Sequence, residues 1–333
     1  MRTRGRLSQS VDNVFNDPIF LNADEHFVRC GSLTFRLKFA SRCLADIFLP
    51  SFIPTDDRDF DLTIAFAAAN NIDLSGIVPI PHDRPRVFSN DLEYAVWQPG
   101  MRDVLSVLDF EPKRAFIWLP HNAPPAWYAS RPALPFVHAM TTATPWSAVH
   151  GGCVGLNGRC LLLAGKGKSG KTTASLSCAR AGWNYAGDDY VFANTETGDI
   201  KPLFATARLR TAAMDEFSAL LTTSAELSHD DGDARHELRL ADFVGRHRLK
   251  GGKLAAILLP RRRGAERPEF TPTRRSDAFS ALLPSTSVGL LGWPDKTARK
   301  VAALVEQAPV FFVDTGNAPR YIPDAFREFL DHM

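Results

Sequence analysis

Short runs in which apolar and polar residues alternate dominate the first third of the chain. Residues 27–39 and 61–69 have the pattern of half-buried strands. Residues 85–97 predict two strands joined by a turn at residues 90–91, where Asn is followed by Asp. The pattern therefore predicts a β-rich N-terminal region over residues 1–119.

Two stretches interrupt this strand pattern. Residues 41–52 have the composition of a short helix, and Ser41 is placed to cap its N-terminus. Residues 120–145 begin with a proline-rich segment, and proline breaks regular structure. We therefore interpret residues 120–145 as an irregular connector between two domains.

After the connector, the pattern over residues 146–333 changes. Residues 153–165 predict a hairpin that turns at residues 157–158, and residues 171–182 predict a helix that ends at a glycine. A short strand follows and ends at residues 188–189. The succession of strand, glycine-rich loop, helix and strand is typical of an α/β fold.

Four more runs have the periodicity of regular elements: strands at 253–260 and 310–314, and helices at 294–308 and 322–333. Asp295 is expected to cap the first of these helices. Residues 224–242 are highly charged and poor in large apolar side chains, so we expect a loop or mobile flap there.

Composition narrows the class of protein. The 39 Lys and Arg against 37 Asp and Glu leave a net charge of +2, which gives no basis for binding nucleic acid or an anionic membrane. The five cysteines are an odd number without a C-x-x-C pair, so neither a disulfide framework nor a zinc site is indicated. No signal peptide or membrane span is visible. We expect a soluble cytoplasmic protein.

The strongest motif is G-x-x-x-x-G-K-[ST], which spans residues 165–172. It arises by chance in a chain of this length on the order of one time in a hundred, and it lies between a predicted strand and a predicted helix, as such a loop requires. Backbone N–H groups of the loop would hold a polyphosphate, Lys171 would reach the β- and γ-phosphates, and Thr172 would bind Mg²⁺. The expected nucleotide-binding residues are Gly165, Lys166, Gly167, Lys168, Ser169, Gly170, Lys171, Thr172 and Thr173.

Asp188 and Asp189 follow the next predicted strand. There both carboxylates can approach a metal ion and the γ-phosphate. One would bind Mg²⁺, and the other would accept a proton from a hydroxyl or water. Aspartates are also common in solvated turns after strands, and that interpretation stays open.

Residues 149–193 resemble the catalytic core of the HPr kinase/phosphorylase superfamily, whose phosphate-loop fold is related to that of phosphoenolpyruvate carboxykinase. The resemblance consists of a His-Gly pair before a hairpin, the phosphate loop, a helix ending in "AGW" and two aspartates in the same order. It implies catalytic roles for His150 and Lys171, Asp188 as the base, and Thr172 with Asp189 on the metal side. It also implies ATP and Mg²⁺ as cofactors and a serine hydroxyl as the acceptor.

The sequence departs from this family at several places. Gly167 and Lys168 stand where the family's loop usually has serine and glycine, and Thr173 stands where it often has glutamate. The downstream signature rich in glutamate, arginine and glycine has no clean match, so the resemblance does not imply phosphorolysis. The chain is more similar to divergent members, some of which tailor ribosomal peptides such as lasso precursors. Members often form homo-oligomers.

Two groups of arginines are further candidates. Arg208 and Arg210 would share one face of a strand and contact a phosphate or acceptor carboxylate, or else form a solvated face. The run 261–263 follows a predicted strand and either reaches the phosphates or is a solvated cluster.

Three functions remain open from the sequence. The first is a kinase for a serine-type hydroxyl on a peptide or protein. The second is a kinase of the same fold for a small metabolite. The third is a nucleotide-binding regulator without catalysis.

Overall fold

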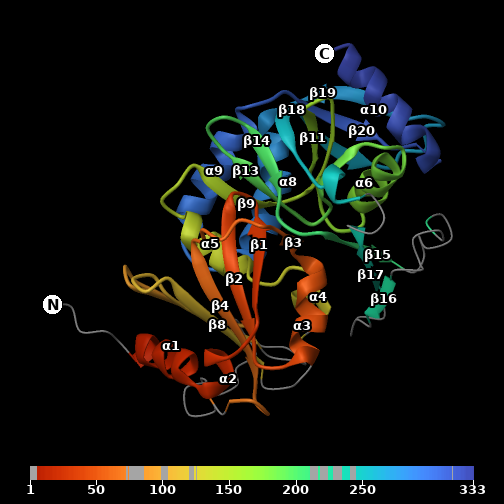
Figure 1. Ribbon diagram of the computed structural model, residues 1–333. Coiled ribbons are helices and arrows are strands. Elements are labelled where there is room, and N and C mark those ends of the chain that lie inside the picture. The colour runs from red at the N-terminus through yellow and green to blue at the C-terminus, as the bar shows by residue number, and fades with distance from the viewer. Residues whose placement is uncertain are drawn as a thin grey trace. The chain divides into compact units, whose positions relative to one another are not determined.

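The computed structural model describes residues 6–72, 74, 86–98, 104–119, 124, 126–210, 217, 224–227, 235–240, 245–316 and 318–333 (Figure 1). The chain divides into two compact units, residues 1–140 and 141–333. Both units combine helices with mixed β-sheets, so the α/β class is confirmed.

An eight-stranded sheet forms the centre of the first unit, in the order β3-β1-β2-β4-β8-β7-β6-β5. The three strands β2, β4 and β8 are parallel, and the other pairs are antiparallel. The strands are β1 (Glu25–Cys30), β2 (Leu33–Phe39), β3 (Ile53–Pro54), β4 (Leu62–Ala68), β5 (Arg86–Ser89), β6 (Glu93–Gln98), β7 (Val104–Asp109) and β8 (Arg114–Leu119). The helices are α1 (Arg6–Asn16), α2 (Pro18–Leu21), α3 (Arg42–Phe48), α4 (Ala126–Ala129) and α5 (Leu134–Thr141).

The predicted turn and helix of the first unit are confirmed. Asn90 Oδ1 accepts hydrogen bonds from the backbone N–H groups of Leu92 and Glu93, both at 2.7 Å, and closes the β5–β6 hairpin. Ser41 caps α3, since its hydroxyl accepts the N–H of Leu44 at 3.4 Å.

Two expectations for the first unit were wrong. Strand β4 is buried at all seven positions instead of half-buried, because it lies between β2 and β8 in the middle of the sheet. The stretch 120–145 was expected to lack regular structure, but it contains α4 and α5, and the division between the two units at residues 140–141 falls within it. Pro135 stands in the first turn of α5, where a missing N–H costs little.

The second unit contains a nine-stranded sheet in the order β12-β10-β11-β18-β14-β13-β9, and β20 also pairs with β18 and β19. Strands β11, β18 and β20 are parallel neighbours. Its strands are β9 (Trp146–His150), β10 (Gly152–Leu156), β11 (Arg159–Leu163), β12 (Asn184–Gly187), β13 (Tyr190–Asn194), β14 (Asp199–Pro202), β18 (Gly252–Arg261), β19 (Glu269–Thr273) and β20 (Val310–Asp314). The helices are α6 (Lys171–Arg180), α8 (Arg275–Gly289), α9 (Pro294–Val305) and α10 (Ile322–Asp331).

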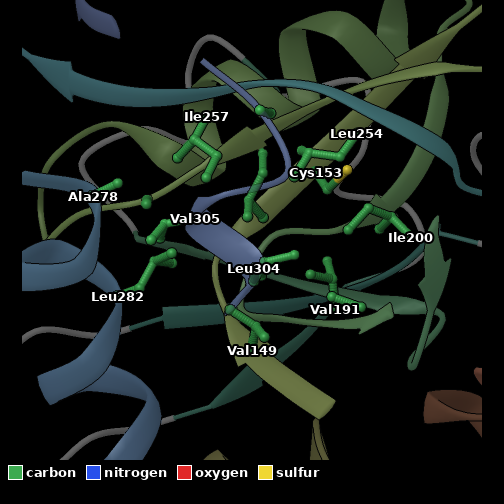
Figure 2. Packing of buried hydrophobic residues seen from close by; sticks show 14 of the residues in the cluster. Val149, Cys153, Val191, Ile200, Leu254, Ile257, Ala278, Leu282, Leu304 and Val305 are labelled. Carbon is green, nitrogen blue, oxygen red and sulfur yellow. The ribbon is translucent and has the colours of Figure 1, made fainter. Parts of the chain in front are cut away.

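Helices cover both faces of this sheet. Successive side chains along a strand point to opposite faces, so each strand contributes side chains to both layers of helices. On β11, Cys160 and Leu162 join a core with α8 and α9, while Leu161 and Leu163 pack with α6 and α10. Figure 2 shows the first core, in which Leu282 and Leu304 from the two helices face sheet residues such as Val149. The continuous apolar run in β11 follows from burial on both sides.

The predicted hairpin at residues 157–158 is confirmed, and both of its turn residues have positive φ, 51° at Asn157 and 79° at Gly158. Asn followed by Gly is the favoured pair for such a turn. The helix expected to start after Asp295 has Trp293 as its N-cap, and Pro294 is its first residue. Proline suits that position because it lacks an N–H, so Asp295 lies in the first turn instead.

Residues 224–242 were expected to form a loop, but they contain two strands. Strands β16 (Ser224–Leu227) and β17 (Arg235–Arg239) join β15 (Thr206–Arg210) in a small antiparallel sheet. Main-chain hydrogen bonding between neighbours stabilises such a sheet although few of its side chains are apolar. The prediction was wrong because a high charge indicates only that the side chains of a segment are solvated. It does not indicate whether the backbone of that segment pairs with another strand.

The structure agrees with the absence of a disulfide framework, since Cys30, Cys43, Cys153, Cys160 and Cys178 are all free. Within the described residues, every helix is too short or too polar to span a bilayer.

Candidate functional site

The glycine-lysine loop lies at the carboxyl end of a buried strand. Strand β11 ends at Leu163, and α6 begins at Lys171. Gly170 is the N-cap of α6 with a φ of 102°, a conformation that favours glycine, and it supplies no side-chain cap. Because the first N–H groups of a helix have no intrahelical partner, the first turn of α6 can offer them to an anion.

Lys171 is buried against this loop. Its Nζ donates hydrogen bonds to the carbonyl oxygens of Gly165 at 2.6 Å and Lys166 at 3.1 Å. Burial lowers the pKa of Lys171, and the nearby carboxylates of Asp189 and Asp188 partly oppose that effect. The loop backbone therefore fixes a desolvated ammonium group where a polyphosphate would gain most from it.

Asp188 follows β12 directly and is almost fully buried. Its Oδ1 accepts the hydroxyl of Tyr185 at 3.0 Å, and its Oδ2 accepts the backbone N–H of Arg208 at 3.2 Å. Burial and the neighbouring charge of Asp189 raise the pKa of Asp188 to about 6, although the bonds from Arg208, Thr172 and Tyr185 favour the charged form. A carboxylate with this pKa can accept a proton near neutral pH.

A glycine on the adjacent strand allows Asp188 and α6 to lie close together. A Cβ at Gly152, on β10, would lie 2.6 Å from Ser175 Oγ and 3.5 Å from the Cα of Asp188. A larger residue would push the helix away from the strand. The sequence around 150–152 thus sets the distance between the phosphate loop and the carboxylate.

His150 and Asp189 form a pair at the edge of the same site. Antiparallel pairing of β9 with β13 puts His150 opposite Tyr190, which brings Asp189 beside it. The Nε2 of His150 lies 3.0 Å from Asp189 Oδ1. Thr286 Oγ1 accepts the backbone N–H of His150 at 3.1 Å, and the ring packs edge-on against Tyr190. The resemblance implied a catalytic role for His150, and the partner that the strand register gives it is Asp189.

One cavity of about 250 Å³ brings most of these groups together. It is lined by residues 167–173 of the loop and helix, and by His150, Asp188, Asp189, Arg208, Leu209 and Arg262. Gly165 and Lys166 were expected to contact a nucleotide, yet neither lines the cavity, and the side chain of Lys166 is exposed. Their carbonyl groups hold Lys171 instead.

The arginine candidates separate in the structure. Arg208 lines the cavity from β15, and the side chain of Arg210 lies outside the described residues. Of the run 261–263, Arg262 reaches the cavity, while the guanidinium of Arg261 stacks over Phe312 at 4.3 Å. Successive side chains at the end of β18 point to opposite sides, so these two neighbouring arginines have different surroundings.

Tyr185 belongs to the candidate site, and sequence reasoning missed it. Its hydroxyl, buried in β12, donates to Asp188 and lies 3.2 Å from the carbonyl of Thr206. A tyrosine three positions before an acidic pair was the only available signal. Such a signal is weak, because a tyrosine in a strand is commonly a core residue.

The residues present fit a magnesium-nucleoside triphosphate. Open space surrounds a Cβ at Gly167, which leaves room against the loop backbone, and Thr172 hydrogen-bonds Asp188 at the start of α6. Among the described residues, no three His, Cys, Asp or Glu groups gather as a metal site of their own. Mg²⁺ needs none, since it is usually held by one or two carboxylates together with substrate phosphates and water.

The chain matches no family model, and no curated protein matches its sequence. The chemistry of the cavity is therefore the basis for assigning a function. That chemistry consists of an uncapped helix N-terminus, a buried lysine, two carboxylates, a histidine and two arginines within one cavity.

Proposed function

We propose that this protein is a kinase that transfers the γ-phosphate of ATP to a serine-type hydroxyl of a peptide or protein. The observation that supports this most is that a phosphate loop and a buried carboxylate with a raised pKa line the same cavity. Phosphoryl transfer requires positioning and charge neutralisation more than covalent chemistry, and this cavity provides groups for both.

On the phosphate side, Lys171 and the first turn of α6 provide positive charge. The lysine ammonium, held by two carbonyl groups, would contact the β- and γ-phosphates. Arg208 and Arg262 would neutralise charge that develops during transfer. Thr172 and Asp189 would hold Mg²⁺, which would supply positive charge to offset that of the phosphates.

On the acceptor side, Asp188 would take the proton of the attacking hydroxyl. The acceptor oxygen forms a bond to the γ-phosphorus, the bond between that phosphorus and the bridging oxygen breaks, and ADP leaves. Tyr185 and the backbone N–H of Arg208 hold the two oxygens of Asp188, which fixes the direction of the carboxylate. His150 would orient Asp189 through their 3.0 Å contact.

The resemblance of residues 149–193 to the HPr kinase/phosphorylase superfamily supports the same proposal. Of the members of this superfamily, we favour the subgroup that phosphorylates a serine of a peptide. The members that act on HPr have a glutamate-containing signature, and residues 202–217 contain no match to it. Under this assignment the first unit, residues 1–140, would recognise the acceptor.

Replacing Asp188 tests the proposal. We expect Asp188→Asn to abolish transfer from labelled ATP while ATP still binds, since the amide cannot accept the proton. The control Asp295→Asn changes an exposed aspartate on α9 and should keep full activity. Wild-type activity in Asp188→Asn would contradict the role of this residue.

A small-metabolite kinase is a second candidate. The two arginines in the cavity favour it, since they would also bind an acidic acceptor. Incubation with labelled ATP and the products of neighbouring genes separates the options. A phosphopeptide supports the first proposal, a phosphometabolite the second, and the absence of any labelled product a nucleotide-binding regulator.

A further inference from the structure

A second cavity lies on the other flank of the phosphate loop. It has a volume of about 260 Å³ and shares Gly170, Thr173 and Arg262 with the first cavity. Its remaining wall consists of Thr315, Gly316, Pro319 and Ile322. One water molecule occupies roughly 30 Å³ in the liquid, so this volume is far more than a packing defect.

A buried carboxylate fixes the wall of this second cavity. Strand β20 ends at Asp314, whose Oδ2 accepts the N–H groups of Arg263 at 2.9 Å and Ala265 at 3.4 Å. Its Oδ1 accepts the N–H of Gly316 at 3.2 Å. Asp314 thereby ties together the segments that follow β18 and β20, so the cavity is preformed at the carboxyl ends of two parallel strands, where α/β sheets bind ligands.

The chemistry of the two cavities differs. The first contains the acidic and imidazole groups, Asp188, Asp189 and His150. Among the described residues that line the second, Arg262 carries the charge, and the others offer the hydroxyls of Thr173 and Thr315 and the ring of Pro319, while Ile322 is buried behind them. Hydroxyl groups beside a proline ring suit a nucleoside, and a guanidinium can pair with a phosphate or stack on a flat ring.

The two cavities meet at the N-terminus of α6. A Cβ at Gly170 would lie 3.8 Å from Thr315 Oγ1, so the end of the phosphate loop touches the wall of the second cavity. A triphosphate whose reacting end lies at Asp188 must direct its other end away from the carboxylates. The second cavity, which shares Arg262, is where that end would arrive.

We propose that the second cavity binds the nucleoside part of the nucleotide. ATP then lies across the first turn of α6, with its γ-phosphate beside Asp188 and its base between Arg262 and the ring of Pro319. This inference rests on the proposed function, because it assumes that the phosphate loop holds a nucleoside triphosphate.

Filling the cavity tests the inference. Pro319 is half-buried at the start of a 3₁₀ turn, Pro319–Tyr321, so a tryptophan there would occupy the cavity without entering the core. We expect Pro319→Trp to weaken the binding of Mg²⁺-ATP at least tenfold in calorimetry, and to leave the binding of Mg²⁺ with inorganic tripolyphosphate within twofold of wild type. Tripolyphosphate has no nucleoside, so it needs only the loop.

The control is Arg320→Trp, which places the same side chain on the neighbouring exposed residue outside the cavity lining. It should bind both probes like wild type. Unchanged ATP binding in Pro319→Trp, or an equal loss of both probes, would overturn the nucleoside site. If the wild-type protein binds tripolyphosphate but binds ATP no more tightly, the nucleoside site is refuted, while the phosphate-binding role of the loop is kept. If it binds neither ligand, the proposed function is refuted as well.

Photolabelling gives a test that needs no variant. Wild-type protein irradiated with 8-azido-ATP should carry the label on residues 318–322, as located by mass spectrometry of its peptides. Excess tripolyphosphate should suppress the label, because both ligands require the loop. Labelling confined to other segments would overturn the assignment.

Discussion

The two units each contain a strand that runs into a helix beside two further parallel strands, and the junction in the second unit lines a cavity that contains charged groups. In the first unit, β2 leads through two residues to α3, beside β4 and β8. In the second, β11 leads through residues 164–170 to α6, beside β18 and β20. Ser41 caps α3 with its own hydroxyl, whereas Gly170 leaves the start of α6 without a side-chain cap.

The difference shows what makes a helix N-terminus available to a ligand. A serine cap satisfies an N–H group internally, which stabilises the helix and removes a binding group. A glycine with positive φ curls the loop and leaves those N–H groups for an anion, and Lys171 adds a cation. The fold supplies both junctions, and the residues of the turn decide which one can bind.

The largest expected effect is at Lys171. Replacing it with methionine removes the buried ammonium that a triphosphate would contact, and a charge-assisted hydrogen bond contributes about 1.5–3 kcal/mol. We expect Lys171→Met to weaken tripolyphosphate binding about 100-fold, measured by calorimetry with Mg²⁺.

Lys166→Met is the matched control, because this side chain is exposed in the same loop and does not line the cavity. It should weaken binding by no more than about threefold through the loss of a screened surface charge. Equal losses of tripolyphosphate affinity in the two variants would show that the loop attracts phosphate by net charge alone. The difference between the starts of α6 and α3 would then not explain binding.

Asp188 should make stability depend on pH. The pKa of an ordinary aspartate is 3.8 and that of Asp188 in the folded protein is about 6, so the folded state binds more protons between these values. The protonated form favours folding: this contribution is fully present below pH 3.8 and is lost as the pH rises through 6. Urea unfolding should show wild type losing roughly 2–3 kcal/mol relative to Asp188→Asn between pH 4 and pH 7. Parallel pH profiles would contradict the burial of this carboxylate.

The glycine at the start of α6 should be sensitive to substitution for conformational reasons. At Gly170 the φ of 102° strains any L-residue, while a Cβ there meets only Thr315 Oγ1 at 3.8 Å. Gly170→Ala should therefore cost about 1–2 kcal/mol of stability. Gly167→Ala, where a Cβ meets nothing within 4 Å, should be nearly neutral. A comparison of chemical denaturation midpoints checks both, and the reverse order would refute this account of the loop.

The smallest effect is expected at the capped junction. Ser41→Ala removes the hydroxyl that accepts the N–H of Leu44, and loss of an N-cap costs about 1 kcal/mol. Ser41→Asp keeps an acceptor and should retain most of the stability. If Ser41→Ala unfolds at the same urea concentration as wild type, the cap contributes nothing and the contrast with Gly170 loses its energetic basis.

The predictions from the sequence were accurate where a local rule is strong. Asn157-Gly158 predicted the hairpin, Ser41 predicted a cap, and the motif predicted a turn between β11 and α6. They were wrong where a local rule competes with pairing or burial. Residues 224–242 looked too charged for strands, and Asp295 looked like a cap although Pro294 already begins the helix.

By itself, the sequence determined the phosphate loop, its neighbouring elements and the two aspartates, because these depend on contiguous residues and on backbone preferences. Only the tertiary structure decided which distant groups join them. Strand register paired His150 with Asp189, the fold brought the backbone N–H of Arg208 to Asp188, and the parallel order of β11 and β18 brought Arg262 to the loop. Contacts between residues far apart in the chain depend on which strands pair and in which register, and no local pattern specifies that pairing.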